Sequence, residues 1–177
     1  MPDHALELSF DEASAHAVEA QWEALRHAGL PSQADHRSMT NAPHLTLVAA
    51  MPIDPGVVGP AVALLGPLLP TVLSVRGLLV LGDGPRVTLA HLVEPDAAVA
   101  DAVASLRALV PGVRHPVWTP HVTLARRVPR RRLADAIEVL HDASPVRELV
   151  ADRLRWWDPD LRVVETISGQ TGEAHTG

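Results

Sequence analysis

The stretch PHLTL at residues 43–47 is written again, with one conservative change, as PHVTL at residues 120–124. The composition of the chain predicts roughly 0.05 chance copies of the pattern P-H-x-T, so two copies indicate a constraint. In each copy a His and a Thr lie two positions apart, with aliphatic residues between and after them. Residues two apart on a β-strand point to the same face of a sheet. Each copy therefore predicts a strand with a polar His/Thr face and an aliphatic core face, and the two polar faces predict two walls of one site.

The composition limits both the architecture and the possible chemistry. The chain has 177 residues, which suffices for one domain with a substantial core. Phe10 is its only Phe or Tyr, so Leu, Val and Ala must build most of that core. Cysteine is absent, which excludes disulfides, iron–sulfur clusters and thiol nucleophiles and is compatible with the cytoplasmic location that we expect. The net charge of −6 argues against a general nucleic-acid coat, although a short oligonucleotide or a cyclic phosphate still fits a locally positive cleft.

Residues 55–75 carry no charge and are long enough to raise the question of a membrane span. Proline and glycine recur throughout this stretch and would interrupt a helix repeatedly. We therefore expect a short buried helix at residues 57–65 followed by a strand, and no association with a membrane.

Hydrophobic periodicity predicts strands and helices that alternate along the chain. The expected strands cover residues 5–10, 44–50, 72–81, 86–93, 121–126, 146–157 and 161–168, and the expected helices cover residues 11–28, 57–65, 97–109 and a segment after Pro129. The order is β-α-β-α-β, then β-α-β-α-β-β after a hairpin, and this order predicts an α+β fold. We expect residues 1–168 to form a single two-lobed domain and residues 169–177 to form a disordered polar tail.

A pair of H-x-T-x tetrapeptides separated by several tens of residues resembles the signature of the two-histidine phosphoesterase superfamily. Within it, the chain is most similar to the branch of 2′-5′ RNA ligases and cyclic nucleotide phosphodiesterases. The segment WTPHVTLAR at residues 118–126 includes the Leu-Ala-Arg continuation often seen in that branch. The element order fits as well, so the resemblance covers most of residues 5–168. It implies a two-lobed α+β fold, with pseudo-symmetric antiparallel sheets, outer helices and a central cleft.

The resemblance also implies an activity and a set of site residues. The activity would be that of a metal-independent phosphodiesterase, or a reversible RNA ligase, acting on 2′,3′-cyclic phosphates or 2′-5′ linkages of RNA or nucleotides. It would need no cofactor, and its partner would be an RNA end, an oligonucleotide or a cyclic nucleotide; we expect a monomer. His44 and His121 match the catalytic histidines, Thr46 and Thr123 match the phosphate-contacting hydroxyls, and Arg126 lies where many relatives keep a basic residue.

The chemistry of a cyclic phosphate explains why these residue types suit the task. Opening the ring requires a base that takes a proton from water and an acid that protonates the departing ribose oxygen. Histidine serves in both roles because its ordinary pKa lies near neutrality. In-line attack places the nucleophile and the leaving group on opposite sides of phosphorus, so the two imidazoles must face each other across a cleft. The resemblance assigns His121 as base and His44 as acid in hydrolysis, whereas the residues alone are symmetric.

Several other residues have two interpretations. Trp118, just before the second motif, is placed either to stack on a nucleobase or to pack over a strand end. Five arginines within residues 126–132 predict either an attraction for RNA phosphates or a solvated helix face. His36 and His115 are expected to be surface residues in loops near the motifs, and His91 is expected to be structural.

Two other functions are compatible with the motifs. A metal-dependent hydrolase would use His44 and His121 as metal ligands. Against it, the chain has no H-x-H or H-E-x-x-H cluster, and neither motif contains an acidic residue. A non-catalytic module that binds RNA or nucleotides on the same fold would keep the motifs without turnover.

Overall fold

The computed structural model of the chain describes residues 3–36, 41–159 and 163–169. The strands are β1 (His4–Phe10), β2 (His44–Ala50), β3 (Thr71–Leu81), β4 (Arg86–Glu94), β5 (His121–Pro129), β6 (Glu148–Asp158) and β7 (Val163–Gly169). The helices are α1 (Glu12–His27), α2 (Val58–Leu65), α3 (Ala97–Ala108) and α4 (Leu133–Asp142). The predicted α+β fold class and the predicted order of elements are confirmed. Residues 170–177 of the predicted tail lie outside the described residues.

All seven strands belong to one antiparallel sheet, whose main path runs β2-β1-β6-β3-β4-β5. Strand β6 joins the two halves of this sheet. Its first residues pair with β3 and its later residues pair with β7 along one edge, while β1 pairs along the other edge. The two lobes are therefore halves of one continuous sheet, linked by a single long strand.

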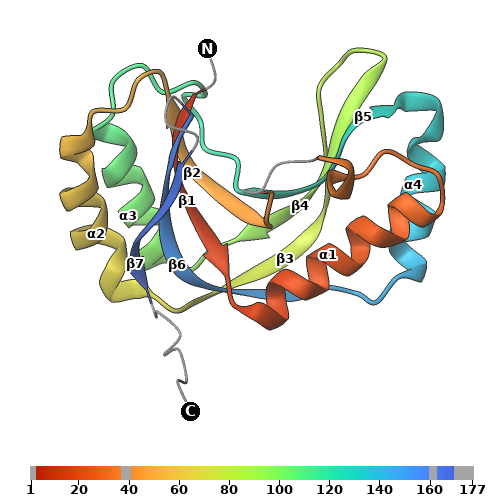
Figure 1. Ribbon diagram of the computed structural model, residues 1–177, viewed down its shortest axis with the longest axis horizontal. Helices are drawn as coiled ribbons and strands as arrows, with labels where there is room; N and C mark the ends of the chain where they lie inside the picture. The colour runs from red at the N-terminus through yellow and green to blue at the C-terminus, as the bar shows by residue number, and fades with distance from the viewer. Residues whose placement is uncertain (1–2, 37–40, 160–162, 170–177) are drawn as a thin grey trace.

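Two pairs of helices flank the sheet at its opposite ends (Figure 1). Helix α2 packs beside α3 at one end, and α1 packs beside α4 at the other. Helices from one half of the chain contact strands from the other half, since α1 contacts β5 and α3 contacts β2. Each motif strand is thus supported by a helix from the other half of the sequence.

Local sequence signals explain the limits of helix α1. The Asp11 side chain accepts a hydrogen bond of 2.8 Å from the Ser14 backbone N–H, which satisfies a donor that the first turn leaves free. Gly29 follows the helix with a φ of 64°, a left-handed conformation that favours glycine. Between these ends, the predicted apolar stripe is buried in the core: Val18, Trp22 and Leu25.

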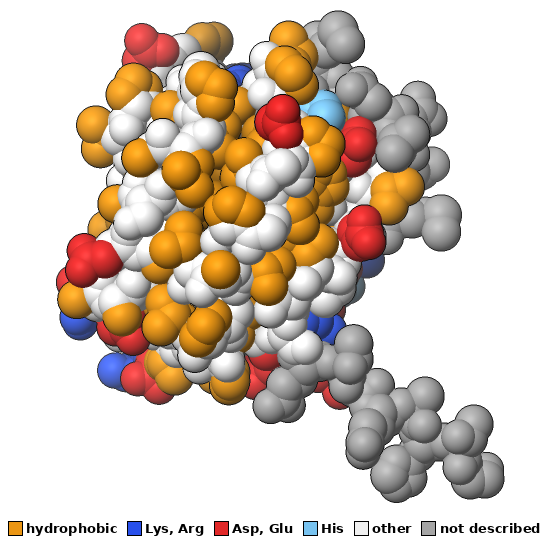
Figure 2. All heavy atoms as spheres, turned by 90° about the vertical axis from the view of Figure 1, so that its left-hand side faces the viewer, with side chains coloured by type: hydrophobic (Ala, Val, Ile, Leu, Met, Phe, Trp, Pro, Cys, Tyr) orange, Lys and Arg blue, Asp and Glu red, His pale blue; other side chains and the backbone are white. Residues whose placement is uncertain are grey.

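The uncharged stretch at residues 55–75 forms a 3-10 turn, helix α2, a second 3-10 turn and the start of β3. The predicted short helix followed by a strand is present, but the helix is only partly buried and not buried as expected. Ala61 and Leu65 are buried, while Pro60 and Ala63 are exposed. Figure 2 shows the face on which α2 and α3 lie, where apolar side chains predominate over charged ones. No helix in the described part of the chain is long and apolar enough to cross a membrane.

His91 on β4 is a buried structural residue, 5% exposed. Gln21 Nε2 donates to the Ser144 carbonyl at 3.3 Å, which directs Gln21 Oε1 toward His91 Nε2 at 2.6 Å. An amide oxygen only accepts, so His91 Nε2 carries the proton. His91 Nδ1 is buried without a hydrogen-bond partner among the described residues. A second proton there would have no acceptor, and burial lowers the pKa of His91 to about 4.

Acid should therefore destabilise the fold through His91. The unfolded chain binds this proton at the ordinary pKa of 6.5, whereas the folded chain binds it only near pH 4. The contribution of neutral His91 to the free energy of unfolding is complete above pH 6.5. It decreases by about 3 kcal/mol in total as the pH falls toward 4. The free energy of unfolding, measured with urea at pH 7 and at pH 4.5, should decrease less between these two pH values for His91→Asn than for the wild type. Equal losses would contradict this, and His141→Asn, at an exposed histidine, is the matched control.

Candidate active site

The two motif histidines, His44 and His121, are the first residues of β2 and β5. The burial pattern along both strands alternates as the sequence predicts. The His and Thr of each motif are half-buried, whereas the aliphatic residues between and after them are 0% exposed. Each motif therefore fixes its strand in the core by its aliphatic face and leaves its polar face available.

Strands β2 and β5 are the outermost strands of the main path of the sheet. Nevertheless, Cα atoms of the two strands approach within 8 Å of each other. The sheet must therefore curve strongly, as twisted sheets do, until its two outer strands meet (Figure 1). This curvature brings together two motifs that are far apart in the sequence.

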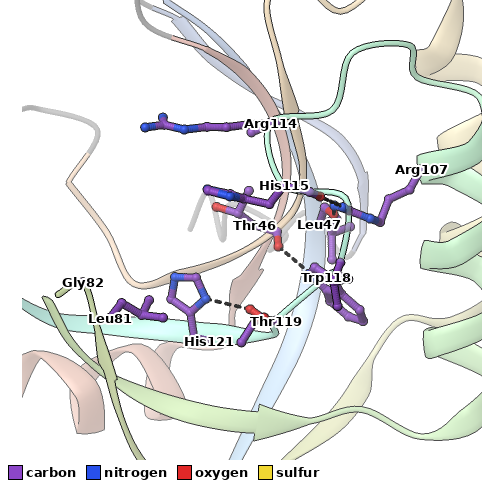
Figure 3. A pocket seen from close by; sticks show the side chains of 12 residues that line it. Thr46, Leu47, Leu81, Gly82, Arg107, Arg114, His115, Trp118, Thr119 and His121 are labelled. Atoms are coloured by element: carbon purple, nitrogen blue, oxygen red, sulfur yellow. Dashed lines mark hydrogen bonds between the residues drawn. The ribbon is translucent and has the colours of Figure 1, made fainter.

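Two adjoining pockets lie where these strands meet. His121 lines the first pocket, which has a volume of about 360 Å³, and His44 lines the second, of about 350 Å³. Thr46, Ala49 and Arg114 line both pockets. In Figure 3 the His121 ring rises from β5 toward Thr46 on the facing strand. A hydroxyl and a guanidinium group thus lie at the boundary between two spaces, each lined by one imidazole.

The two imidazoles are held in the same way. His44 Nδ1 lies 2.8 Å from the Ala42 carbonyl oxygen, and His121 Nδ1 lies 2.7 Å from the Thr119 carbonyl oxygen (Figure 3). A carbonyl only accepts, so Nδ1 carries a proton and donates in both rings. In each ring Nε2 is therefore the nitrogen that can take or give a second proton.

An indole supports each motif strand at the same position. Trp22 Nε1 donates to the Thr123 carbonyl at 3.0 Å, and Trp118 Nε1 donates to the Thr46 carbonyl at 3.0 Å. An edge strand has unpaired backbone groups on its outer side, and these indole N–H groups satisfy one such carbonyl in each strand. Trp118 therefore packs over β2, and its half-buried ring also lines the first pocket.

Thr123 and Arg126 occupy different positions around the cleft. Thr123 lies on the same face of β5 as His121, yet it does not line either of the two pockets. Arg126 is exposed and lines the second pocket together with His44. The structure thus brings His44, Thr46 and Arg126 to one pocket, whereas Thr123 lines neither pocket.

A β-bulge in β5 accounts for the position of Arg126. The register with β4 shifts twice. Ala90 pairs with Thr123 but Leu89 pairs with Ala125, so Leu124 is an extra residue, and Val87 then pairs with Val128, which leaves Arg126 and Arg127 opposite Thr88 alone. Arg127 has a φ of 60°, an uncommon conformation for a residue with a side chain. The first shift places the neighbouring Leu124 and Ala125 both in the core, so Arg126 points away from it, whereas strict alternation from Leu124 would direct Arg126 into the core. Of the other arginines in residues 126–132, two make intramolecular contacts: Arg130 with the Asp83 carbonyl, and Arg132 with Asp135.

Two arginines near the first pocket were not singled out by the sequence. Arg107 on α3 donates to the Leu47 carbonyl at 2.9 Å and to the His115 carbonyl, and so fastens the loop before β5 to β2. Desolvation lowers the pKa of Arg107 from its ordinary value. Arg114, which lines both pockets, forms an ion pair of 2.7 Å with Asp3. Neither residue belongs to a motif, so only the folded chain reveals them.

The second pocket also has polar walls that the sequence did not indicate. Gln33 Nε2 donates to Asn41 Oδ1 at 3.0 Å, and Asn41 Nδ2 donates to the Gln33 carbonyl at 2.9 Å. Glu7, which is 6% exposed, lies beside His44 in the same pocket. His36 is exposed, as predicted, but it lines this pocket too. Among the described residues, no three His, Asp or Glu side chains are grouped so as to hold a metal ion.

A family model of the 2′-5′ RNA ligase superfamily matches residues 13–162, a range that includes both motifs. The chain belongs to this superfamily. The predicted relation to the two-histidine phosphoesterases is therefore confirmed. No curated protein matches the chain by sequence.

Solved structures of Usb1 and LigT share the fold of this superfamily member. Usb1 of Kluyveromyces marxianus with uridine monophosphate is 12% identical with a TM-score of 0.52, and the match covers 94% of this chain and 98% of Usb1. E. coli LigT with 3′-AMP is 14% identical with a TM-score of 0.51, covering 96% of this chain and 95% of LigT. LigT in its apo form is 12% identical with a TM-score of 0.50, and this match also covers 96% of this chain and 95% of LigT. At these identities the likeness shows the fold alone.

Proposed function

We propose that this protein is a metal-independent phosphodiesterase, able to act as an RNA ligase in the reverse direction, on 2′,3′-cyclic phosphates or 2′-5′ linkages of RNA or nucleotides. The observation that carries this proposal is the matched pair of imidazoles. Each is fixed through Nδ1 by a backbone carbonyl, and each lines one of two adjoining pockets. Paired imidazoles with free Nε2 atoms supply the acid and the base that displacement at phosphorus requires.

In the proposed hydrolysis, a water oxygen attacks the phosphorus of a 2′,3′-cyclic phosphate while His121 Nε2 takes a proton from that water. The bond from phosphorus to one ribose oxygen breaks, and His44 Nε2–H gives its proton to this oxygen. Thr46 donates a hydrogen bond to a non-bridging oxygen as negative charge develops there. Arg114 and Arg126 supply positive charge on the walls of the cleft. The two imidazoles exchange roles in the reverse, bond-forming direction.

The substrate that we propose is an RNA end, an oligonucleotide or a cyclic nucleotide. The nucleotides in the Usb1 and LigT structures support a ligand of this class for a chain with the same fold. The first pocket supports it as well, because Trp118, Leu47 and Val117 give it an apolar wall against which a nucleobase could lie.

A screen with identified products tests this function. Protein treated exhaustively with a chelator is incubated with 2′,3′-cyclic nucleotides and with 2′-5′ dinucleotides, and each product is recorded. We expect conversion of a cyclic phosphate to one phosphomonoester, or cleavage of the dinucleotide, without added metal. Binding without turnover would instead identify a non-catalytic nucleotide-binding module. Turnover that disappears on chelation and returns with metal would identify a metal-dependent hydrolase.

A further inference from the structure

The two halves of the site differ at one interior position. On β1, Glu7 is the cross-strand partner of Thr46, whereas on β4 the partner of Thr123 is Ala90. Both positions are buried, with Glu7 6% exposed and Ala90 0% exposed. The strand next to the first motif therefore carries a carboxylate opposite Thr46, whereas the strand next to the second motif carries only a methyl group opposite Thr123.

The carboxylate of Glu7 lies against the ring of His44. Glu7 Oε2 is 3.5 Å from His44 Nδ1 and 3.0 Å from Arg155 Nη2. The Nδ1 proton is already donated to the Ala42 carbonyl at 2.8 Å, so Glu7 acts on the ring through its charge. The side chains of Glu7 and Arg155 are 7% and 12% exposed. A buried carboxylate needs a charged partner, and Arg155 holds it in place.

His121 has no such neighbour. In the part of the chain that the structure describes, no carboxylate forms an ion pair with His121, whose Nδ1 contacts only the Thr119 carbonyl. A negative charge 3.5 Å from an imidazole attracts the positive charge that the ring carries before it donates a proton. The Glu7 side chain is 7% exposed and the His44 side chain 29% exposed, so water screens this attraction less than it would between two fully exposed groups. The pseudo-symmetric site is therefore electrostatically unequal.

We propose that Glu7, held by Arg155, is a positioning residue that favours His44 over His121 as the proton donor of the pair in hydrolysis. This inference rests on the proposed function. In hydrolysis the His44 ring passes its Nε2 proton to the departing ribose oxygen as the bond to phosphorus breaks, and the ring becomes neutral. Glu7 and Arg155 exchange no proton at any point.

A substrate that needs no proton donor separates this role from a merely structural one. Uridine 2′,3′-cyclic phosphate is compared with its analogue in which sulfur replaces the bridging oxygen that leaves, as identified from the wild-type product. A thiolate leaves without protonation, so the analogue still needs the base but not the acid. We expect Glu7→Gln to lower kcat/KM about tenfold for the oxygen substrate and less than about twofold for the sulfur analogue. His44→Ala should show the same selectivity, and His121→Ala should lower both rates.

The ratio of the two rates does not depend on the fraction of folded enzyme, so a partly unfolded variant remains informative. Equal losses on both substrates would overturn the role of Glu7. Should Glu7→Gln fail to fold, Glu7→Asp retains the charge at a greater distance and should show a smaller loss with the same selectivity. Glu94→Gln, at an exposed carboxylate paired with Arg76, is the control and should change neither rate. If the wild type converts neither substrate, the proposed function fails, and not this inference alone.

Discussion

Replacing either motif histidine with alanine should lower kcat for uridine 2′,3′-cyclic phosphate by about 10²- to 10⁴-fold. His44 and His121 belong to different strands and line different pockets, so we expect that neither ring can take over the task of the other. The double variant should therefore lose little more than the worse single variant, because the two groups act as a unit. Steady-state kinetics in the presence of a chelator measures all three variants.

The loss should concern turnover more than binding. The pockets keep their other walls in both variants, so the affinity for 3′-AMP, measured by calorimetry, should fall much less than kcat. His141→Ala, on the exposed face of α4, makes the same chemical change away from the cleft and should leave kcat unchanged. A folded His44 or His121 variant with kcat within a few-fold of the wild type would refute paired acid/base catalysis.

Thr46→Val should lower kcat by roughly 10²-fold, the effect expected when one hydrogen bond to a developing negative charge is removed. Thr46 is the motif hydroxyl that lines both pockets, where the scissile phosphate would lie between the two imidazoles. Valine keeps the β-branched shape that suits strand β2, so the fold should be retained. The decrease should appear in kcat rather than in KM, because the interaction strengthens in the transition state.

Thr123→Val is the companion variant. Thr123 occupies the equivalent position of the second motif but does not line either pocket. Its effect on kcat should therefore be smaller than that of Thr46→Val, although both substitutions exchange the same groups on half-buried strand residues. A larger loss at Thr123, or a change confined to KM at Thr46, would contradict the position of the phosphate proposed here.

Local signals in the sequence were sufficient to predict the elements. The alternation of polar and aliphatic residues gave β2 its observed limits, His44–Ala50, and the Asp11 cap with Gly29 beyond the end gave α1 its limits to within a residue or two. These signals depend on the period of side chains along a strand or helix and on groups that satisfy helix ends. Neither depends on distant parts of the chain.

Contacts between distant segments could not be predicted in the same way. The approach of β2 to β5 depends on the curvature of a whole sheet, and Arg107 acts on β2 from a helix in the other half of the chain. Glu7 alternates with leucines on β1 like an ordinary solvent-facing residue. It is buried beside His44 because β1 lies between β2 and β6 and its polar face lies in the wall of the second pocket.

The positions of the register shifts in β5 could not be predicted from the sequence either. Alternation along residues 121–124 would place the charged Arg126 in the core, which indicates an irregularity but not its position, and the chain offers no glycine where Arg127 adopts its positive φ. Only the register against β4 shows where β5 accommodates its two extra residues.

A crystal structure of the protein with uridine vanadate, a five-coordinate mimic of in-line displacement, tests most directly whether imidazoles from the two outer strands act on one phosphorus. We predict that His44 Nε2 and His121 Nε2 each lie within about 3.2 Å of an apical oxygen, on opposite sides of the vanadium. Thr46 Oγ1 should contact an equatorial oxygen. A vanadate held by one histidine alone, or by both from the same side, would contradict paired catalysis across this cleft.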